Sequence, residues 1–79
     1  MKYAVPYDIP REFTRIALDG KQFHSNYAEI LVWCKSNCTE EEYYVPTRIK
    51  AIYDYEHYHD IAAYFRDRNK AMMFKLKWS

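Results

Sequence analysis

The stretch HSNYAEILVWCKSNC, residues 24–38, carries the clearest periodicity in the chain. Its apolar side chains recur at helical intervals, so they fall on one face of an α-helix. Asn26 and Glu29 have the spacing of a capping box, and Asn37 suits the end of a helix. The pattern therefore predicts a helix that turns two thiols toward the core and places Trp33 on another face. The buried face comprises Tyr27, Ile30, Leu31, Cys34 and Cys38.

The segment before it, YDIPREFTRIALDG at residues 7–20, is ambiguous. Its apolar residues recur at helical spacing, a proline suits the first turn and Gly20 suits the end, so we predict a short helix. A strand is the alternative, because Thr14, Ile16 and Leu18 also alternate with other residues.

The middle of the chain is typical of a sheet. EEEYYVP, residues 40–46, indicates a short strand approached by acidic residues. Residues 48–66 have a period of two, with one set mostly apolar and the other mostly polar, which predicts strands with one buried side. Because this run is too long for one ordinary strand, we predict a hairpin that turns near His57 to Asp60. A single long helix from Thr47 is the rival interpretation.

The C-terminal segment ends in AMMFKLKWS, residues 71–79. Asp67 has the position of an N-cap for a short helix over residues 68–73. Phe74, Leu76 and Trp78 then alternate with two lysines. This alternation predicts a last strand or extended segment docked in the core.

These elements predict an α+β fold. We expect a small single domain over residues 1–79, with helices packed on a three- or four-stranded, mainly antiparallel sheet. The chain has room for one domain, and 49% of its 79 residues are hydrophobic, which argues against disorder.

Composition excludes several classes of function. A net charge of +1 argues against a general nucleic-acid coat or a polyanionic mimic of DNA. One glycine in the chain excludes phosphate-binding loops and dinucleotide motifs. No window resembles a signal peptide or a membrane span, so we expect a cytoplasmic protein with reduced cysteines and no membrane partner. Two cysteines four residues apart, without a second pair, are not a zinc signature.

The most chemically loaded stretch is DYEHYHD at residues 54–60. On a strand, His57 and His59 share a face, a spacing that some metal sites use, and His24 is a conceivable third ligand. Asp54 and Glu56 share the other face, as paired acids in a hydrolase do. A solvated hairpin tip, also holding Asp60, explains the stretch more simply. We therefore predict no catalytic residue, no metal and no cofactor, and a protein that is not an enzyme.

Two surfaces remain as candidates for binding. Tyrosine and tryptophan are in excess, and such residues anchor protein interfaces. The predicted protein-binding residues are Trp33, Tyr43, Tyr44, Tyr55 and Tyr58. The alternative is a nucleic-acid surface in the basic and aromatic C-terminal segment. Its predicted residues are Arg66, Arg68, Lys70, Lys75 and Lys77.

The C-terminal sequence YFRDRNKAMMFKLKW resembles the endings of small accessory proteins of tailed bacteriophages, with an Ala-x-x-Phe followed by a Leu-x-Trp close. ILVWCKSN is similar to the helix that often precedes this ending. The resemblance implies a phage or viral origin and a host cytoplasm, and it brings no catalytic residue. The sequence thus predicts a non-enzymatic protein-binding factor, a phage protein that engages or inhibits a host protein complex. A small nucleic-acid-binding module is the alternative.

Overall fold

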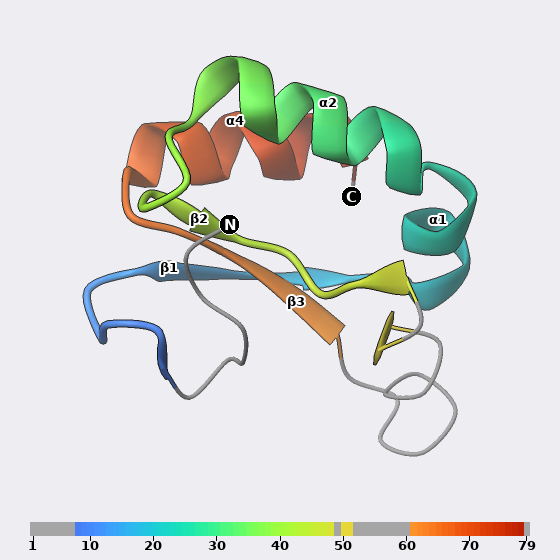
Figure 1. Cartoon of the computed structure of the whole chain (residues 1–79), viewed down its shortest axis with the longest axis horizontal. Helices are drawn as coiled ribbons and strands as arrows, with labels where there is room; N and C mark the ends of the chain where they lie inside the picture. The colour runs from blue at the N-terminus through green and yellow to red at the C-terminus, as the bar shows by residue number, and fades with distance from the viewer. Residues whose placement is uncertain (1–7, 49, 52–60, 79) are drawn as a thin grey trace.

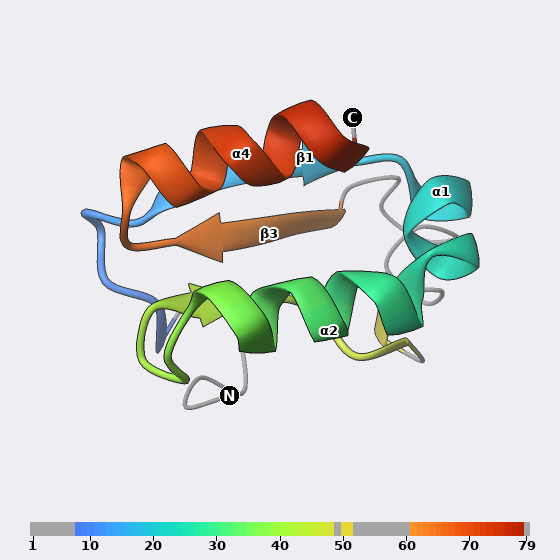
Figure 2. The same cartoon turned by 90° about the horizontal axis from the view of Figure 1, so that it is seen from above.

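A computed structural model describes residues 8–48, 50–51 and 61–78 of the chain. Within these ranges the elements are a three-stranded sheet and three helices, an α+β domain as predicted. Helices α2 and α4 lie side by side in opposite directions over one face of the sheet, and α1 lies at one end (Figures 1 and 2). The elements are β1 (Thr14–Leu18), α1 (Gly20–Ser25), α2 (Tyr27–Asn37), β2 (Tyr43–Tyr44), β3 (Ile61–Phe65) and α4 (Arg68–Trp78).

The sheet has β3 as its central strand, in the order β1-β3-β2, and both pairings are antiparallel. Ile16 lies opposite Ala63, and Tyr43 lies opposite Phe65. Because side chains alternate along a strand, Ile16, Ala63 and Phe65 share the face that α2 and α4 cover. The core lies between that face and the helices.

The predicted helix over residues 7–20 is wrong, and the alternative strand is confirmed over Thr14–Leu18. Each of its five residues has a partner on β3, and such tertiary pairing outweighs a weak helical pattern. Gly20 begins α1, where we had expected it to end a helix. The Asp19 side chain caps α1 by accepting a hydrogen bond of 2.9 Å from the Lys21 amide.

The predicted helix over residues 24–38 is confirmed as α2, but its predicted ends differ. Asn26 precedes α2 but makes no side-chain capping bond. It also ends α1, where its amide donates to the Gln22 carbonyl at 3.0 Å. Asn37 stays within the helix, and its Nδ2 donates to the Trp33 carbonyl at 2.8 Å. Cys38, with an extended backbone, ends the helix.

The predicted hairpin over residues 48–66 is wrong in its first arm, where Arg48, Lys50 and Ala51 are helical. Thr47 caps this turn, since its Oγ1 accepts a 3.1 Å hydrogen bond from the Lys50 amide. The second arm is confirmed as β3. With β1 on one side and β2 on the other, β3 pairs with distant strands. The turn predicted near His57 to Asp60 lies outside the described residues.

The C-terminal segment is one continuous helix, so the predicted final strand is wrong. Nothing in residues 68–78 breaks a helix, and alanine, methionine, leucine and lysine favour one. At about 100° per residue, Phe74 and Trp78 fall on the same face and are buried. Leu76 falls on the opposite face and is 83% exposed. The prediction that Leu76 docks in the core is therefore wrong, while those for Phe74 and Trp78 are confirmed.

Asp67 caps α4 as predicted. Its Oδ1 accepts hydrogen bonds from the amides of Asn69 at 2.8 Å and Lys70 at 3.4 Å. We expect Asp67→Ala to lower the free energy of unfolding by about 1 kcal/mol, measured by urea denaturation, because these amides lose their acceptor. Asp67→Ser is the control, since serine keeps an acceptor oxygen and should restore most of the loss. Equal stability of the alanine variant and the wild type would contradict a capping role.

Candidate interaction surface

Trp33 connects α2 to both the sheet and α4. Its ring is half-buried and meets Phe65 and Phe74 edge-on, with centroids 6.2 and 5.7 Å away. It also meets Trp78 at 5.7 Å with an interplanar angle of 84°. Edge-to-face aromatic pairs at these distances are attractive. Trp33 is thus a core-edge residue that leaves part of its indole on the surface.

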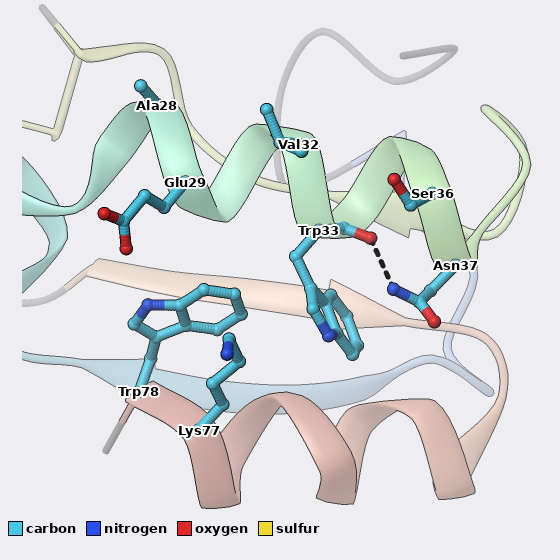
Figure 3. A pocket seen from close by; sticks show the side chains of 8 residues that line it. All are labelled: Ala28, Glu29, Val32, Trp33, Ser36, Asn37, Lys77 and Trp78. Atoms are coloured by element: carbon cyan, nitrogen blue, oxygen red, sulfur yellow. Dashed lines mark hydrogen bonds between the residues drawn. The ribbon is translucent and has the colours of Figure 1, made fainter.

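An open groove lies beside this aromatic junction, between α2 and the end of α4 (Figure 3). Its volume is about 470 Å³, and most of its surface is apolar. Lys77 Nζ lies 5.2 Å from the centroid of the Trp78 ring, and Glu29 points toward that ring from the facing helix. The groove is lined by Ala28, Glu29, Val32, Trp33, Ser36, Asn37, Lys77 and Trp78.

The solvent side of α4 carries a second apolar feature, the outer ridge, formed by Met72, Met73 and Leu76. These side chains are 45%, 52% and 83% exposed. Helical spacing places them within about 100° of one another, on the side away from Phe74 and Trp78. The outer ridge therefore presents three flexible or branched apolar side chains to solvent.

Positive charges flank the outer ridge on both sides. By helical spacing, Arg68 and Lys75 lie along one side, and Lys70 and Lys77 lie along the other. The sequence of α4 contains no aspartate or glutamate. Lys70 Nζ lies 3.6 Å from Glu42 Oε2, an ion pair that ties α4 to the segment before β2. The surface combines apolar side chains with a local excess of positive charge.

Glu42 holds the connection between α2 and β2 in place. Its Oε1 accepts a 2.8 Å hydrogen bond from the Thr39 amide. This hydrogen bond lowers the pKa of the Glu42 carboxyl, and the nearby Lys70 ammonium lowers it further by a smaller amount. The carboxylate therefore links the segment after α2 to the first turn of α4 through the Thr39 amide and the Lys70 ammonium.

The predicted protein-binding residues do not form one patch. Tyr43 and Tyr44 are each 2% exposed, so the prediction that they extend a surface patch is wrong. Tyr43 belongs to the core cluster, and the Tyr44 ring lies beside Tyr64, with ring centroids 6.1 Å apart. Trp33 is part of the groove, as described above. Tyr55 and Tyr58 lie outside the described residues.

The predicted nucleic-acid residues are largely on the surface, but the rings needed for stacking are not. Phe65 and Trp78 are buried, and Tyr64 is half-buried. The Arg66 guanidinium lies over the Phe13 ring, 5.5 Å from its centroid. The basic residues therefore flank aliphatic side chains rather than exposed rings.

In the part of the chain that the structure describes, no three potential metal ligands lie together. His24 there accepts a 3.4 Å hydrogen bond at Nδ1 from Arg48 Nε. Asp54, Glu56, His57, His59 and Asp60 lie outside the described residues.

The two thiols are free, with Cys34 buried and Cys38 half-buried. Burial, and then the neighbouring Cys38, raise the pKa of Cys34 from 9.0 to about 12. Burial also raises the pKa of Cys38. Neither thiol is an activated nucleophile, since the thiolate is the reactive form.

We expect iodoacetamide at pH 8 to alkylate Cys38 before Cys34 in the folded protein, measured by peptide mass spectrometry. The same protein in urea is the control, where both thiols should react at similar rates.

An unfolded thiol ionises near its ordinary pKa of 9.0, whereas Cys34 in the fold stays neutral. The free energy of unfolding should therefore fall as the pH rises from about 9 toward 12. Faster alkylation of Cys34 than of Cys38 in the folded protein would contradict this account.

The strand predicted for residues 74–78 hides the outer ridge. In a strand, Leu76 shares a face with Phe74 and Trp78. The signal for the ridge was present in the unbroken helix-favouring composition after the Asp67 cap. Extending the predicted helix to Trp78 would have separated Leu76 from the buried face.

Comparison with known proteins finds no matching family model, no similar curated sequence and no similar solved structure. Among the described residues, no helix has both the length and the apolar character needed to cross a membrane.

Proposed function

We propose that this chain is a non-enzymatic protein-binding factor whose partner covers the outer ridge of α4. The observation that carries the proposal is the exposure of Leu76, Met73 and Met72 on one side of a single helix. Apolar side chains gathered on a surface often mark an interaction site. Methionine adapts its shape to a partner, and burying such a side chain contributes roughly 1.5–3 kcal/mol.

The resemblance of the C-terminal segment to accessory proteins of tailed bacteriophages directs the search for that partner. We propose that the partner belongs to a bacterial protein complex in the host cytoplasm, which the chain engages or inhibits. The segment that carries the resemblance contains the whole of α4.

Nucleic-acid binding by Arg66, Arg68, Lys70, Lys75 and Lys77 is the second candidate, supported by the charge of α4. It is less well supported than protein binding, because sequence-tolerant stacking needs exposed rings and α4 exposes methionine and leucine instead. Phosphate contacts make affinity fall steeply with salt. A gel shift with single-stranded RNA at low salt, abolished at high salt, would favour this candidate.

The test of the proposed function is capture of bacterial proteins by the tagged wild type and by Leu76→Gln/Met73→Gln. These substitutions keep side-chain size and charge but make the ridge polar, so we expect the specific partner to be lost by about tenfold or more. Ala17→Gln is the matched control, because it places a glutamine at an exposed position on the sheet face opposite Ile16. Quantitative mass spectrometry provides the measurement, and thermal melts verify that all three proteins are folded.

Equal capture of the same proteins by the wild type, the control and the ridge variant would contradict a binding role for the outer ridge.

A further inference from the structure

The outer ridge and the groove adjoin each other at Lys77. The Lys77 side chain lines the groove, and around the axis of α4 it lies between Met73 of the ridge and Trp78 of the groove. Met73 lies one helical turn before Lys77. A single partner segment can therefore contact the ridge and the groove together.

The groove calls for a side chain of particular chemistry. Val32 and the indoles of Trp33 and Trp78 make it mostly apolar, and its volume of about 470 Å³ is ample for one large apolar side chain (Figure 3). Asn37 Nδ2 already donates to the Trp33 carbonyl, so that polar pair is satisfied within α2. An aliphatic or aromatic anchor suits this site.

The charges of α4 determine the rest of the partner. Arg68 and Lys75 flank the ridge on one side, and Lys70 and Lys77 flank it on the other. The sequence of α4 supplies no carboxylate, and Lys70 already pairs with Glu42 of the segment before β2. A partner that covers the ridge brings its own charges close to these cations, so carboxylates on both flanks are favoured. The helix is about 16 Å long at 1.5 Å per residue, which matches three turns of a partner helix.

We propose that the partner segment is an acidic amphipathic helix that lies along the outer ridge and inserts one apolar side chain into the groove. This inference rests on the proposed function. The apolar face of the partner helix covers Met72, Met73 and Leu76. The carboxylates of that helix approach Lys75 on one flank of the ridge and Lys77 on the other. Laying an amphipathic helix against an apolar groove is a recurrent mode of protein recognition.

An anionic membrane surface shares part of this chemistry, but the groove favours a peptide. A concave site beside the ridge accepts a protruding side chain, whereas a bilayer surface meets a helix along its length. RNA supplies negative charge but no aliphatic face for the ridge.

The experiment titrates the full chain with synthetic peptides of about 15 residues, long enough to form a helix on binding. The peptides place leucine or phenylalanine on one helical face and glutamate on its flanks, and they contain no tryptophan or tyrosine. A permuted peptide of the same composition, without the amphipathic pattern, is the control. The chain has two tryptophans, Trp33 and Trp78, both lining the groove, so intrinsic fluorescence reports its occupation.

We expect a saturable change of fluorescence with the patterned peptide and none with the permuted one. Lys75→Gln/Lys77→Gln should weaken binding about tenfold, and Leu76→Gln/Met73→Gln by at least as much. Trp33→Phe should remove much of the fluorescence signal. Binding of a fluorescein-labelled peptide, followed by anisotropy, should persist in that variant.

Four results would overturn the inference: no binding of any patterned peptide, equal binding of the permuted peptide, no effect of the lysine substitutions, or binding only to phosphatidylserine vesicles or to poly(U) RNA. Any of these results overturns only the acidic helix, and not the protein-binding function, if the ridge variant Leu76→Gln/Met73→Gln still loses its bacterial partner in the capture experiment. If the ridge variant captures that partner normally, the proposed function fails as well.

Discussion

Deletion of residues 74–79 is expected to leave the protein largely unfolded at 25 °C. The deletion removes Phe74, which is fully buried, and Trp78, which is 5% exposed. The Phe74 ring lies 4.9 Å from Phe65 and 5.1 Å from Trp78, centroid to centroid. Loss of one buried aromatic side chain costs roughly 3–5 kcal/mol, and a small domain has only about 5–15 kcal/mol in total.

Circular dichroism melts measure this effect, with the near-ultraviolet signal reporting aromatic packing. Leu76→Ala is the matched control within the same segment. Because Leu76 is exposed, its truncation should change the free energy of unfolding by less than about 0.5 kcal/mol. A truncated chain with the melting temperature of the wild type would show that the last turns of α4 contribute nothing to the fold.

Trp33→Ala is expected to lower the free energy of unfolding by about 3 kcal/mol, near the lower end of the range for buried aromatics because the indole is half-exposed. The substitution removes three edge-to-face contacts, with Phe65, Phe74 and Trp78. These contacts join α2 to both β3 and α4, so their loss loosens the layer of helices as well as the helix itself.

Urea denaturation measures this loss, and Val32→Ala is its control. Val32 precedes Trp33 on α2 and is 64% exposed, so its truncation should be nearly neutral. The competing expectation treats Trp33 as an anchor for a partner alone. In that case Trp33→Ala would leave the melting curve unchanged while weakening partner binding by about 2 kcal/mol or more.

Local sequence was sufficient where one pattern dominated. Apolar residues such as Ile30 and Cys34 recur at helical spacing, and this local pattern predicted α2. The spacing places them on one side of the helix whatever packs against it. Asp67 predicted the start of α4, since its carboxylate needs only the next few amides to act as a cap. The short strand predicted within EEEYYVP, residues 40–46, is confirmed as β2.

Local sequence was insufficient where two periods coexisted. Thr14–Leu18 fits a helix and a strand, and pairing with β3, some 45 residues later in the chain, selects the strand. The last apolar residues also fit either a strand or a helix, namely Phe74, Leu76 and Trp78. A strand would place Leu76 in the core with the other two, whereas the helix places it on the surface. The candidate site was mislocated for this reason, because its ridge exists only if residues 68–78 form one helix.

The sequence by itself determined an α+β domain with a central amphipathic helix, an aromatic core and a basic C-terminal segment. These properties follow from composition and from short-range periodicity, which do not depend on contacts between distant segments. Only the tertiary structure decided that β3 lies between β1 and β2 and that Tyr43 and Tyr44 are buried. The physical reason is that each of these depends on which distant segment supplies the missing hydrogen bonds and apolar contacts, and no local pattern encodes that partner.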